Sequence, residues 1–483
     1  MAEPEVAPFS PARKQAIEFV NQGITATAGA NGIAPNAQIG YQLISSAVDV
    51  DPTFAHGWFA MGNANGDLKL KEASVACYRR ALQLPEGKEI GDLTADVRAK
   101  ALCNMGHTLF HLGKHEEAMK CTMASLAMDN TMAFTWCNKS LIHSVRGQDV
   151  EALAAAQRAH QLDPANPTVG VALAFALLHK KLYADGLMHF EARFPYKLTQ
   201  FMNYPYPKWQ GEKDADLFLV SDQGIGDSID FLRFVPAALK RCRKIYLGTQ
   251  PELMRVLHAM FGKYENVHLM ALPQPFPPAT HWAALMSLPT AMGLLGGDIE
   301  WAEMPSFDVP KHNPEWKVPG KKLHVGVAWA GARGNDVDCW RSCQVENFLE
   351  LCRVPNVQFY SLQVGERGQE MHNAGAATLI KDITPYIRDV MDTLAIAKNL
   401  DLIVTVDTGL GHMAGMIDVP TLIPVSFNGC CWRFSRHGDK SLWYPKHKLF
   451  RQAEDCDWKP VFEAIGAELD KLANGGSHAE KAD

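Results

Sequence analysis

Residues 400–420 read Leu-Asp-Leu-Ile-Val-Thr-Val-Asp-Thr-Gly-Leu-Gly-His-Met-Ala-Gly-Met-Ile-Asp-Val-Pro. An apolar, β-branched run typical of a buried strand meets a glycine-rich turn, and an apolar helix follows it. The positive end of that helix would present backbone amides that can hold a phosphate without a metal ion, namely those of Thr408, Gly409, Leu410 and Gly411. The stretch therefore predicts an anion site at a strand-to-helix junction.

A second junction of this kind occurs at residues 217–229, where Leu-Phe-Leu-Val-Ser meets Asp-Gln-Gly-Ile-Gly-Asp-Ser-Ile. After residue 194, apolar runs alternate with helical stretches, which indicates a parallel α/β arrangement. Two such junctions predict two α/β lobes that face one cleft. We expect strands at 217–221, 244–248 and 267–271 in the first lobe, and at 323–329, 358–362, 402–406 and 421–425 in the second.

Length and composition narrow the class of protein. The chain has 483 residues, which predicts three domains at about 150 residues each. A net charge of -6 argues against nucleic acid as the main partner. Eleven cysteines without a C-x-x-C pair favour reduced thiols, and no apolar stretch is long enough for a signal peptide or a membrane span. We therefore expect a cytoplasmic protein without a membrane span.

The first part of the chain repeats itself. Gly106, Ser140 and Ala174 occupy equivalent places in successive units, as do Ala118, Ala152 and Gly186. Small residues at these places let paired helices approach closely. The pattern resembles a tetratricopeptide array of four to five units over 35–194, with an insertion near 86–95; the alternative is an irregular helical bundle.

Such a solenoid predicts a protein or peptide partner bound to its surface. His107, His111 and His115 have the spacing of metal ligands on one helical face, but no carboxylate or cysteine accompanies them. We interpret these histidines as a solvated or groove-lining face.

The expected domains follow from these patterns. They are an N-terminal segment (1–34), the repeat array (35–195), an aromatic and proline-rich joint (196–212), a first Rossmann-like lobe (213–310), a second such lobe (311–470) and a polar tail (471–483). The proline-rich segment 305–319 is the expected linker between the lobes.

Several short motifs occur together in a fixed order. They are Ser-Asp-Gln-Gly-Ile-Gly-Asp-Ser-Ile-Asp-Phe-Leu-Arg-Phe-Val-Pro (221–236), Val-Gly-Val-Ala-Trp-Ala-Gly (325–331), Ser-Leu-Gln-Val-Gly (361–365), Val-Asp-Thr-Gly-Leu-Gly-His-Met-Ala (406–414) and Trp-Tyr-Pro (443–445). This series resembles the glycosyltransferases of the heptosyltransferase family, and more closely their bacterial relatives with N-terminal tetratricopeptide repeats. The resemblance implies a GT-B architecture, with a nucleotide-sugar donor held mainly by the second lobe.

The resemblance also implies a catalytic base. Asp227 matches the aspartate of that role in the family, and Gln223, Gly224 and Gly226 form the acceptor-side turn. The alternative is that Asp227 caps the helix that follows it.

For the departing diphosphate, the candidates are the 408–411 amides with His412, and the loop residues Arg333 and Arg341. Arg341 matches the family better, although this loop is longer and less basic than usual. Asp407 is expected to orient Thr408 or His412. Gln363 matches a position beside the nucleotide, with structural capping as the alternative.

Trp329 either lines the donor pocket or fills the core. Asp336-Val-Asp338 has the D-x-D form of metal-dependent glycosyltransferases of another fold, but little else of that fold surrounds it. We therefore expect no metal and no cofactor other than the nucleotide-sugar co-substrate.

The sequence thus predicts a metal-independent GT-B glycosyltransferase that transfers a sugar from a nucleotide-sugar to a hydroxyl group on a protein recruited by the repeat array. The alternative is a tetratricopeptide interaction scaffold whose GT-B region has lost catalysis. Neither the sugar nor the nucleotide follows from these residues.

Overall fold

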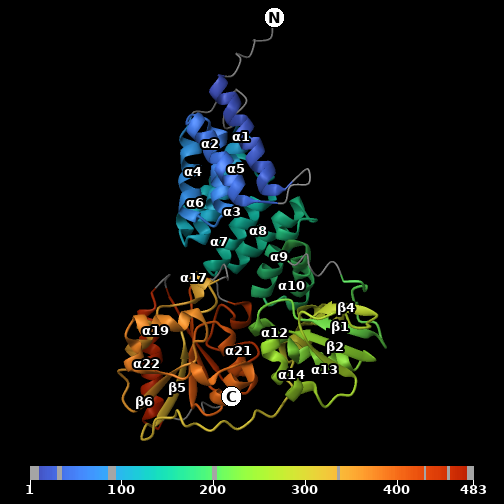
Figure 1. Ribbon diagram of the computed structural model, residues 1–483, viewed down its shortest axis with the longest axis vertical. Helices are drawn as coiled ribbons and strands as arrows, with labels where there is room; N and C mark the ends of the chain where they lie inside the picture. Colours follow the sequence, from blue (N-terminus) through green and yellow to red (C-terminus); the bar gives the residue numbers. More distant parts are fainter. Residues whose placement is uncertain are drawn as a thin grey trace, which may run out of the picture. The chain divides into compact units, whose positions relative to one another are not determined.

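A computed structural model of the protein describes residues 10–29, 35–84, 94–197, 204–333, 338–428, 431–453 and 457–475. The chain forms two compact units, Met1–Ser144 with Gln148–Ala176, and Val145–Gly147 with Leu177–Asp483. Helices make up the first unit, and both β-sheets lie in the second (Figure 1). No helix in the described part of the chain has the length and hydrophobicity needed to cross a membrane.

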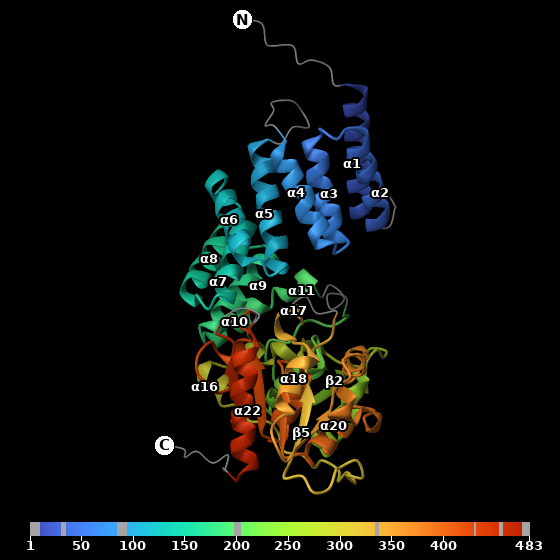
Figure 2. The ribbon, with the colours of Figure 1, turned by 90° about the vertical axis from the view of Figure 1, so that its left-hand side faces the viewer.

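The N-terminal region is a helical solenoid of tetratricopeptide-like hairpins. Its helices are α1 (Pro11–Ala28), α2 (Ala37–Val50), α3 (Ala55–Asp67), α4 (Lys71–Gln83), α5 (Ala95–His111), α6 (His115–Met128), α7 (Ala133–Val145), α8 (Asp149–Leu162) and α9 (Pro167–His179). Consecutive helices pack in pairs, and Figure 2 shows the pairs α1/α2, α3/α4 and α5/α6 side by side. Helix α1, which sequence analysis did not predict, packs against α2. The expected insertion at 86–95 lies largely outside the described residues.

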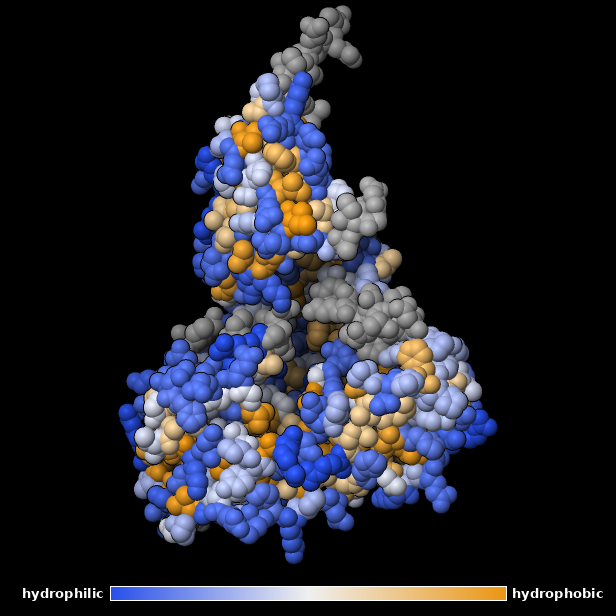
Figure 3. Space-filling view, in the orientation of Figure 1, coloured by the Kyte–Doolittle hydropathy of each residue, from blue (hydrophilic) through white to orange (hydrophobic). Residues whose placement is uncertain are grey.

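The small residues of the repeat pattern lie where paired helices meet, as predicted. A Cβ atom at Gly106 would lie 3.0 Å from Oγ1 of Thr122 and 3.2 Å from the carbonyl of Ala118. In the next pair, the hydroxyl of Ser140 donates to the carbonyl of Ala152 over 2.8 Å. On the face shown in Figure 3, the exposed hydrophobic residues of this unit form separate patches among hydrophilic ones.

The three spaced histidines do not share one helix. Helix α5 ends at His111, and α6 begins at His115 after a turn in which Gly113 has a φ of 74°. The predicted common helical face is therefore wrong, because the chain reverses between them. His107 and His111 pack edge to face with ring centroids 4.5 Å apart, and His107 lies 3.1 Å from the side chain of Asn138.

The second unit begins with short helices and continues into two parallel sheets. Helices α10 (Tyr183–Phe190) and α11 (Arg193–Lys197) precede the first sheet, whose order is β3-β2-β1-β4. Its strands are β1 (Asp216–Val220), β2 (Lys244–Thr249), β3 (Val267–Ala271) and β4 (His281–Ala284). The three strands predicted here are confirmed. Strand β4 was missed because it is only four residues long and follows a proline-rich segment.

The second sheet has the order β10-β9-β8-β5-β6-β7 and is also parallel. Its strands are β5 (Leu323–Ala328), β6 (Val357–Ser361), β7 (Ile380–Asp382), β8 (Leu402–Thr405), β9 (Thr421–Val425) and β10 (His447–Arg451). All four predicted strands are present. The two missed strands, β7 and β10, lie at the edges of the sheet and carry polar residues, so they lack an apolar run.

Buried apolar residues fill the space between the second sheet and its helices. Val325, Val327 and Val404 belong to one cluster with Phe462 and Ile465 of α22 (Lys459–Ala473). Trp316, which lies in the predicted linker, is buried against Tyr360 with ring centroids 5.0 Å apart. The linker is therefore anchored to the second lobe.

Buried charges attach α10 and α11 to the first lobe. The guanidinium of Arg193 donates to Asp222 through Nε over 2.7 Å and to Ser287 through Nη2 over 2.9 Å. Both Arg193 and Asp222 are buried. Asp222 directly precedes the glycine-rich turn at 223–226, so this ion pair fixes the chain where the turn begins.

Candidate functional site

The two glycine-rich turns predicted from sequence meet each other. One connects β1 to α12 (Ile225–Phe231), and the other connects β8 to α21 (Gly409–Met416). Helices α12 and α21 pack together. A Cβ atom at Gly226 would lie 2.7 Å from Cδ2 of His412 and 3.5 Å from Cα of Gly409. Glycine at 226 is what permits the close approach of the two lobes.

Asp227 lies at this junction. Helix α12 begins at Ile225 with Gly224 as its N-cap, so Asp227 is in the first turn and the alternative that it caps the helix is wrong. Gly224 has the extended backbone angles of an N-cap residue, so the helix begins at Ile225, two residues before Asp227. The side chain of Asp227 is 35% exposed, and its Oδ1 accepts a hydrogen bond of 2.8 Å from Nη2 of Arg433.

Gln250, which follows β2, fixes the first turn. Its amide nitrogen donates to the carbonyl of Gln223 over 2.8 Å, and its Oε1 accepts from the hydroxyl of Ser221 over 3.0 Å. Gln223 thus takes part through its main chain. Sequence analysis did not identify Gln250, because it lies on the neighbouring strand rather than in the motif.

Behind the junction lies a buried carboxylate that sequence analysis missed. Asp230 is fully buried, and its Oδ1 accepts a hydrogen bond of 2.9 Å from Nδ1 of His412. Nε of Arg433 lies 2.8 Å from Oδ2 of Asp230, and the hydroxyl of Tyr444 also donates to Asp230. Asp230 belongs to the first lobe, whereas its three partners belong to the second.

These contacts fix the charges of the network. Burial alone would raise the pKa of Asp230, but the charges of His412 and Arg433 hold that pKa below its ordinary value. For His412, burial has the opposite effect and would lower the pKa. The charge and hydrogen bond of Asp230 outweigh burial, so the pKa of His412 is raised. Asp230 is therefore a carboxylate, and the charged form of His412 is favoured.

The turn before α21 offers fewer free amides than predicted. The amide of Gly411 donates to the carbonyl of Thr408 over 3.1 Å, so its expected role as an anion donor is wrong. The amides of Thr408, Gly409 and Leu410 have no backbone acceptor within the described part of the chain. Oγ1 of Thr408 lies 3.0 Å from Oγ1 of Thr405.

Asp407 lies beside the same turn and is partly buried. Burial raises its pKa, while the positive charges of His412, Arg341 and Arg433 oppose that rise. Asp407 therefore lies near three cationic side chains and the carboxylate of Asp227.

The two loop arginines differ in environment. Arg333 is 64% exposed and donates to Glu370 over 3.2 Å. Arg341 is 20% exposed, and its Nε lies 3.7 Å from Oδ1 of Asp338. The positive charge of Arg341 acts on Asp407, whereas Arg333 pairs with Glu370 at the surface. Of the two loop arginines, Arg341 is therefore the one close to the junction.

Asp338, the second aspartate of the D-x-D sequence, is tied to protein partners. Its Oδ2 accepts from Nη1 of Arg367 over 2.8 Å, and its Oδ1 accepts from the hydroxyl of Ser342 over 2.6 Å. Asp336 lies outside the described residues.

Gln363 links the ends of two strands. Its Oε1 accepts hydrogen bonds from the amides of Trp329 (3.1 Å) and Ala330 (3.0 Å). Trp329 is fully buried in the core of the second lobe, and its indole nitrogen donates to Glu370 over 2.9 Å. Trp329 fills the core, which decides between its two predicted roles.

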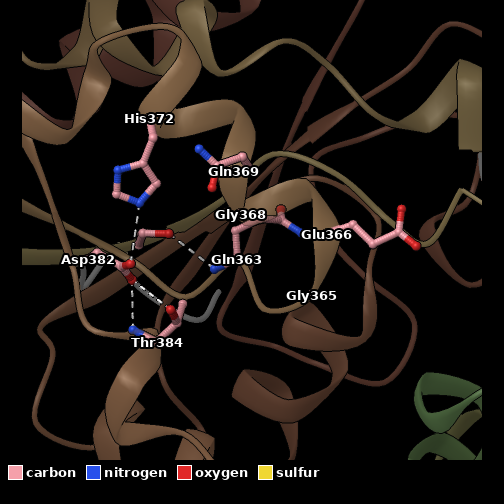
Figure 4. Close-up of a pocket in the computed structure, with 9 residues that line it drawn as sticks. Gln363, Gly365, Glu366, Gly368, Gln369, His372, Asp382 and Thr384 are labelled. Carbon is pink, nitrogen blue, oxygen red and sulfur yellow. Dashed lines mark hydrogen bonds and ion pairs between the residues drawn. The ribbon is translucent and has the colours of Figure 1, made fainter.

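A polar pocket of about 340 Å³ lies at the carboxyl ends of β6 and β7 (Figure 4). It is lined by Ser361, Gln363, Gly365, Glu366, Gly368, Gln369, His372, Asp382 and Thr384. Oδ1 of Asp382 accepts from the amide (2.9 Å) and hydroxyl (2.7 Å) of Thr384, and its Oδ2 lies 3.7 Å from Nε2 of His372. Ligands of open parallel sheets bind at this edge.

A second contact joins the lobes at the surface. Nη1 of Arg255, on α14 (Met254–Phe261), lies 2.9 Å from Oδ1 of Asp389 and 2.7 Å from Oδ1 of Asp392. Asp389 caps α20 (Val390–Ala397), to which Asp392 belongs. The Arg255 side chain is 44% exposed, so this bridge differs from the buried one at Asp230.

Comparison with known proteins identifies the N-terminal region. The tetratricopeptide repeat family matches residues 55–87 and 99–131, so this region contains tetratricopeptide repeats. No curated protein matches the chain.

Solved structures with a similar helical region include three whose similarity is low. The protein described as Pseudomonas aeruginosa pilF shares 14% identity over 48% of this chain and 88% of its own, with a TM-score of 0.33. YrrB, described as a tetratricopeptide protein with an unusual peptide-binding site, shares 12% over 39% of this chain and 89% of its own, with a TM-score of 0.27. A chain of the APC/C hetero-tetramer Cut9–Hcn1 shares 14% identity over 38% of this chain and 34% of its own, with a TM-score of 0.33. The match therefore spans about a third of that chain's length.

Proposed function

We propose that the α/β unit is a glycosyltransferase of GT-B type, which moves a sugar from a nucleotide-sugar donor to a hydroxyl acceptor. The observation that carries this proposal is the juxtaposition of Asp227 on one lobe with His412 and Arg433 on the other, at two glycine-rich turns. Glycosyl transfer needs a proton acceptor close to positive charge, because the acceptor hydroxyl loses a proton while the diphosphate departs.

In this mechanism the second lobe receives the diphosphate. The amides of Thr408, Gly409 and Leu410, which have no backbone acceptor within the described residues, would donate to the departing group, and His412 and Arg341 add positive charge. Preorganised donors gain strength as negative charge develops, so they stabilise the transition state more than the ground state. These groups need no metal ion to neutralise the diphosphate, which supports metal-independent transfer.

Asp227 accepts the acceptor's proton. Its Oδ1 is engaged by Arg433, while Oδ2 has no hydrogen-bond partner within the described part of the chain. An oxygen that is partly exposed and without a partner is suited to accept a proton from a hydroxyl group.

The nucleoside part of the donor occupies the pocket at β6 and β7. The carboxylates, side-chain amides and histidine that line this pocket offer hydrogen-bond partners for the ribose hydroxyl groups and the nucleobase. Gln363 lies between this pocket and the amides of Trp329 and Ala330, and so supports the pocket rather than reading the base.

The acceptor hydroxyl belongs to a protein, which the tetratricopeptide repeats recruit in the cytoplasm. Repeats of this kind form extended surfaces that bind proteins or peptides. An array joined to a transfer site raises the local concentration of the acceptor.

A panel of nucleotide-sugars tests the proposal. Thermal shift and turnover with one donor are expected. A shift without turnover toward protein, peptide or water would instead support the scaffold alternative, and neither a shift nor turnover would reject a nucleotide-sugar site.

Recruitment is tested by removing residues before Leu177, which keeps the helices that Arg193 anchors. Donor binding is expected to persist while transfer to protein falls. Equal transfer rates with and without the array, in a folded variant, would reject recruitment.

A further inference from the structure

We propose that Asp230 is a positioning residue for the donor-diphosphate site, whose buried carboxylate holds the His412 ring as an oriented, charged donor at the start of α21. The inference rests on the glycosyl transfer proposed above and adds a residue that the sequence motifs did not single out. Asp230 touches neither donor nor acceptor in this role. It acts through His412.

The imidazole ring of His412 is held through one of its two nitrogens, and the second nitrogen remains available to a ligand. Nδ1 of His412 donates to Asp230 over 2.9 Å, while Nε2 has no hydrogen-bond partner within the described part of the chain. The Cδ2 edge of the ring faces Gly226, where a side chain would collide with it. Nε2 is therefore a donor whose direction is set by Asp230, and a Cβ atom at residue 226 would lie 3.4 Å from it.

Charged groups from both lobes affect the protonation of His412. Asp230 on α12 and Asp407 before α21 favour the charged imidazolium, while Arg433 opposes it. Tyr444 bonds to the same carboxylate through its hydroxyl. Burial lowers the pKa of His447 to about 3, so that histidine is neutral and adds no charge. Arg233 and Arg341 act on the same two carboxylates, yet the charge and hydrogen bond of Asp230 outweigh burial and keep the charged ring favoured.

Asp230 and His412 lie on different lobes, so the orientation of this donor depends on the packing of α12 against α21.

The decisive measurement is the titration of His412 by NMR with labelled histidine in the full chain, its signal assigned from His412→Gln. The wild-type pKa is expected above the ordinary value of about 6.5. Asp230→Asn keeps the size of the side chain but removes its charge, and is expected to lower the pKa of His412 by about one unit or more. Asp392→Asn is the matched control, since it removes a carboxylate from the separate bridge to Arg255 and is expected to leave His412 unchanged.

A second readout uses inorganic pyrophosphate as the probe. At about pH 7.5, Asp230→Asn is expected to bind pyrophosphate about tenfold more weakly than wild type, because a neutral ring has replaced a charged one. At a pH below the His412 pKa measured by NMR in Asp230→Asn, the ring is protonated in both proteins, and the two affinities should converge. A merely structural role for Asp230 would weaken binding equally at both pH values.

The outcomes separate the inference from the proposed function. If His412 in the wild type titrates below the ordinary range, or if Asp230→Asn leaves its titration unchanged, the inference is overturned. The wild-type titration decides even if Asp230→Asn does not fold. If the His412 titration moves with Asp230 but no nucleotide-sugar is turned over, the positioning role stands and glycosyl transfer is rejected.

Discussion

A Cβ atom at Gly226 would lie 2.7 Å from Cδ2 of His412, which belongs to the opposite lobe. The two lobes can therefore meet at this point only while residue 226 lacks a side chain. The contact brings the Asp227 carboxylate and the first turn of α21 to one place.

Gly226→Ala is expected to weaken donor binding by about tenfold or more, because a methyl group would push α12 and α21 apart by overpacking. Calorimetric titration with the donor measures the effect. Gly224→Ala is the matched control, since its Cβ would meet only Oδ2 of Asp227 at 3.8 Å. Equal affinities of the two variants would show that the close approach at 226 has no bearing on binding.

Asp227→Asn is expected to reduce turnover by about 10²–10⁴-fold with little change in donor affinity, because it removes the proton acceptor while keeping the side-chain size. Single-turnover kinetics with saturating donor provide the measurement. A folded variant with wild-type turnover would falsify the assignment of Asp227 as the base.

Treatment with EDTA is expected to leave transfer intact, because amides and cationic side chains balance the diphosphate. Asp338 is already paired with Arg367, which supports this expectation. Activity that disappeared with EDTA and returned with Mn²⁺ would make Asp336 and Asp338 the diphosphate site instead.

Gln369→Trp is expected to raise the donor dissociation constant by about tenfold or more, because an indole would occupy much of the pocket at β6 and β7. Gln369→Ala is the control variant, because it removes the same side chain and leaves the pocket open. Should both variants bind the donor like wild type, the nucleoside would have to lie elsewhere.

Arg193→Met is expected to destabilise the α/β unit by about 3–5 kcal/mol, because it leaves the Asp222 carboxylate buried without its partner. Urea unfolding followed by near-ultraviolet circular dichroism checks this value. The comparison is Arg243→Ala, which breaks the exposed pair with Asp216 and is expected to change stability little. A similar loss in both variants would contradict the importance of burial at Arg193.

Sequence patterns predicted the parallel sheets well because buried central strands such as β5 and β8 are continuous apolar runs. Edge strands such as β10 have no such run, since one side lacks a neighbour and polar residues are tolerated there.

The candidate site was predicted in part. Glycine turns have a local signature, so the sequence alone pointed to Gly226, Asp227 and His412. It did not point to Asp230, because the role of that residue depends on which face of α12 meets α21, and Arg433 and Tyr444 come from loops far along the chain. The motif around Trp443 and the aromatic residues flanking Arg433 were the available signals.

The surface bridge of Arg255 with Asp389 and Asp392 responds to ions in a way that the buried bridge does not. Dissolved salt screens exposed charges over about 10 Å at 0.1 M, whereas a pair shielded from water is screened much less. Raising the ionic strength should therefore weaken the contact of Arg255 with Asp389 and Asp392, and leave the contacts of Asp230 with His412 and Arg433 intact.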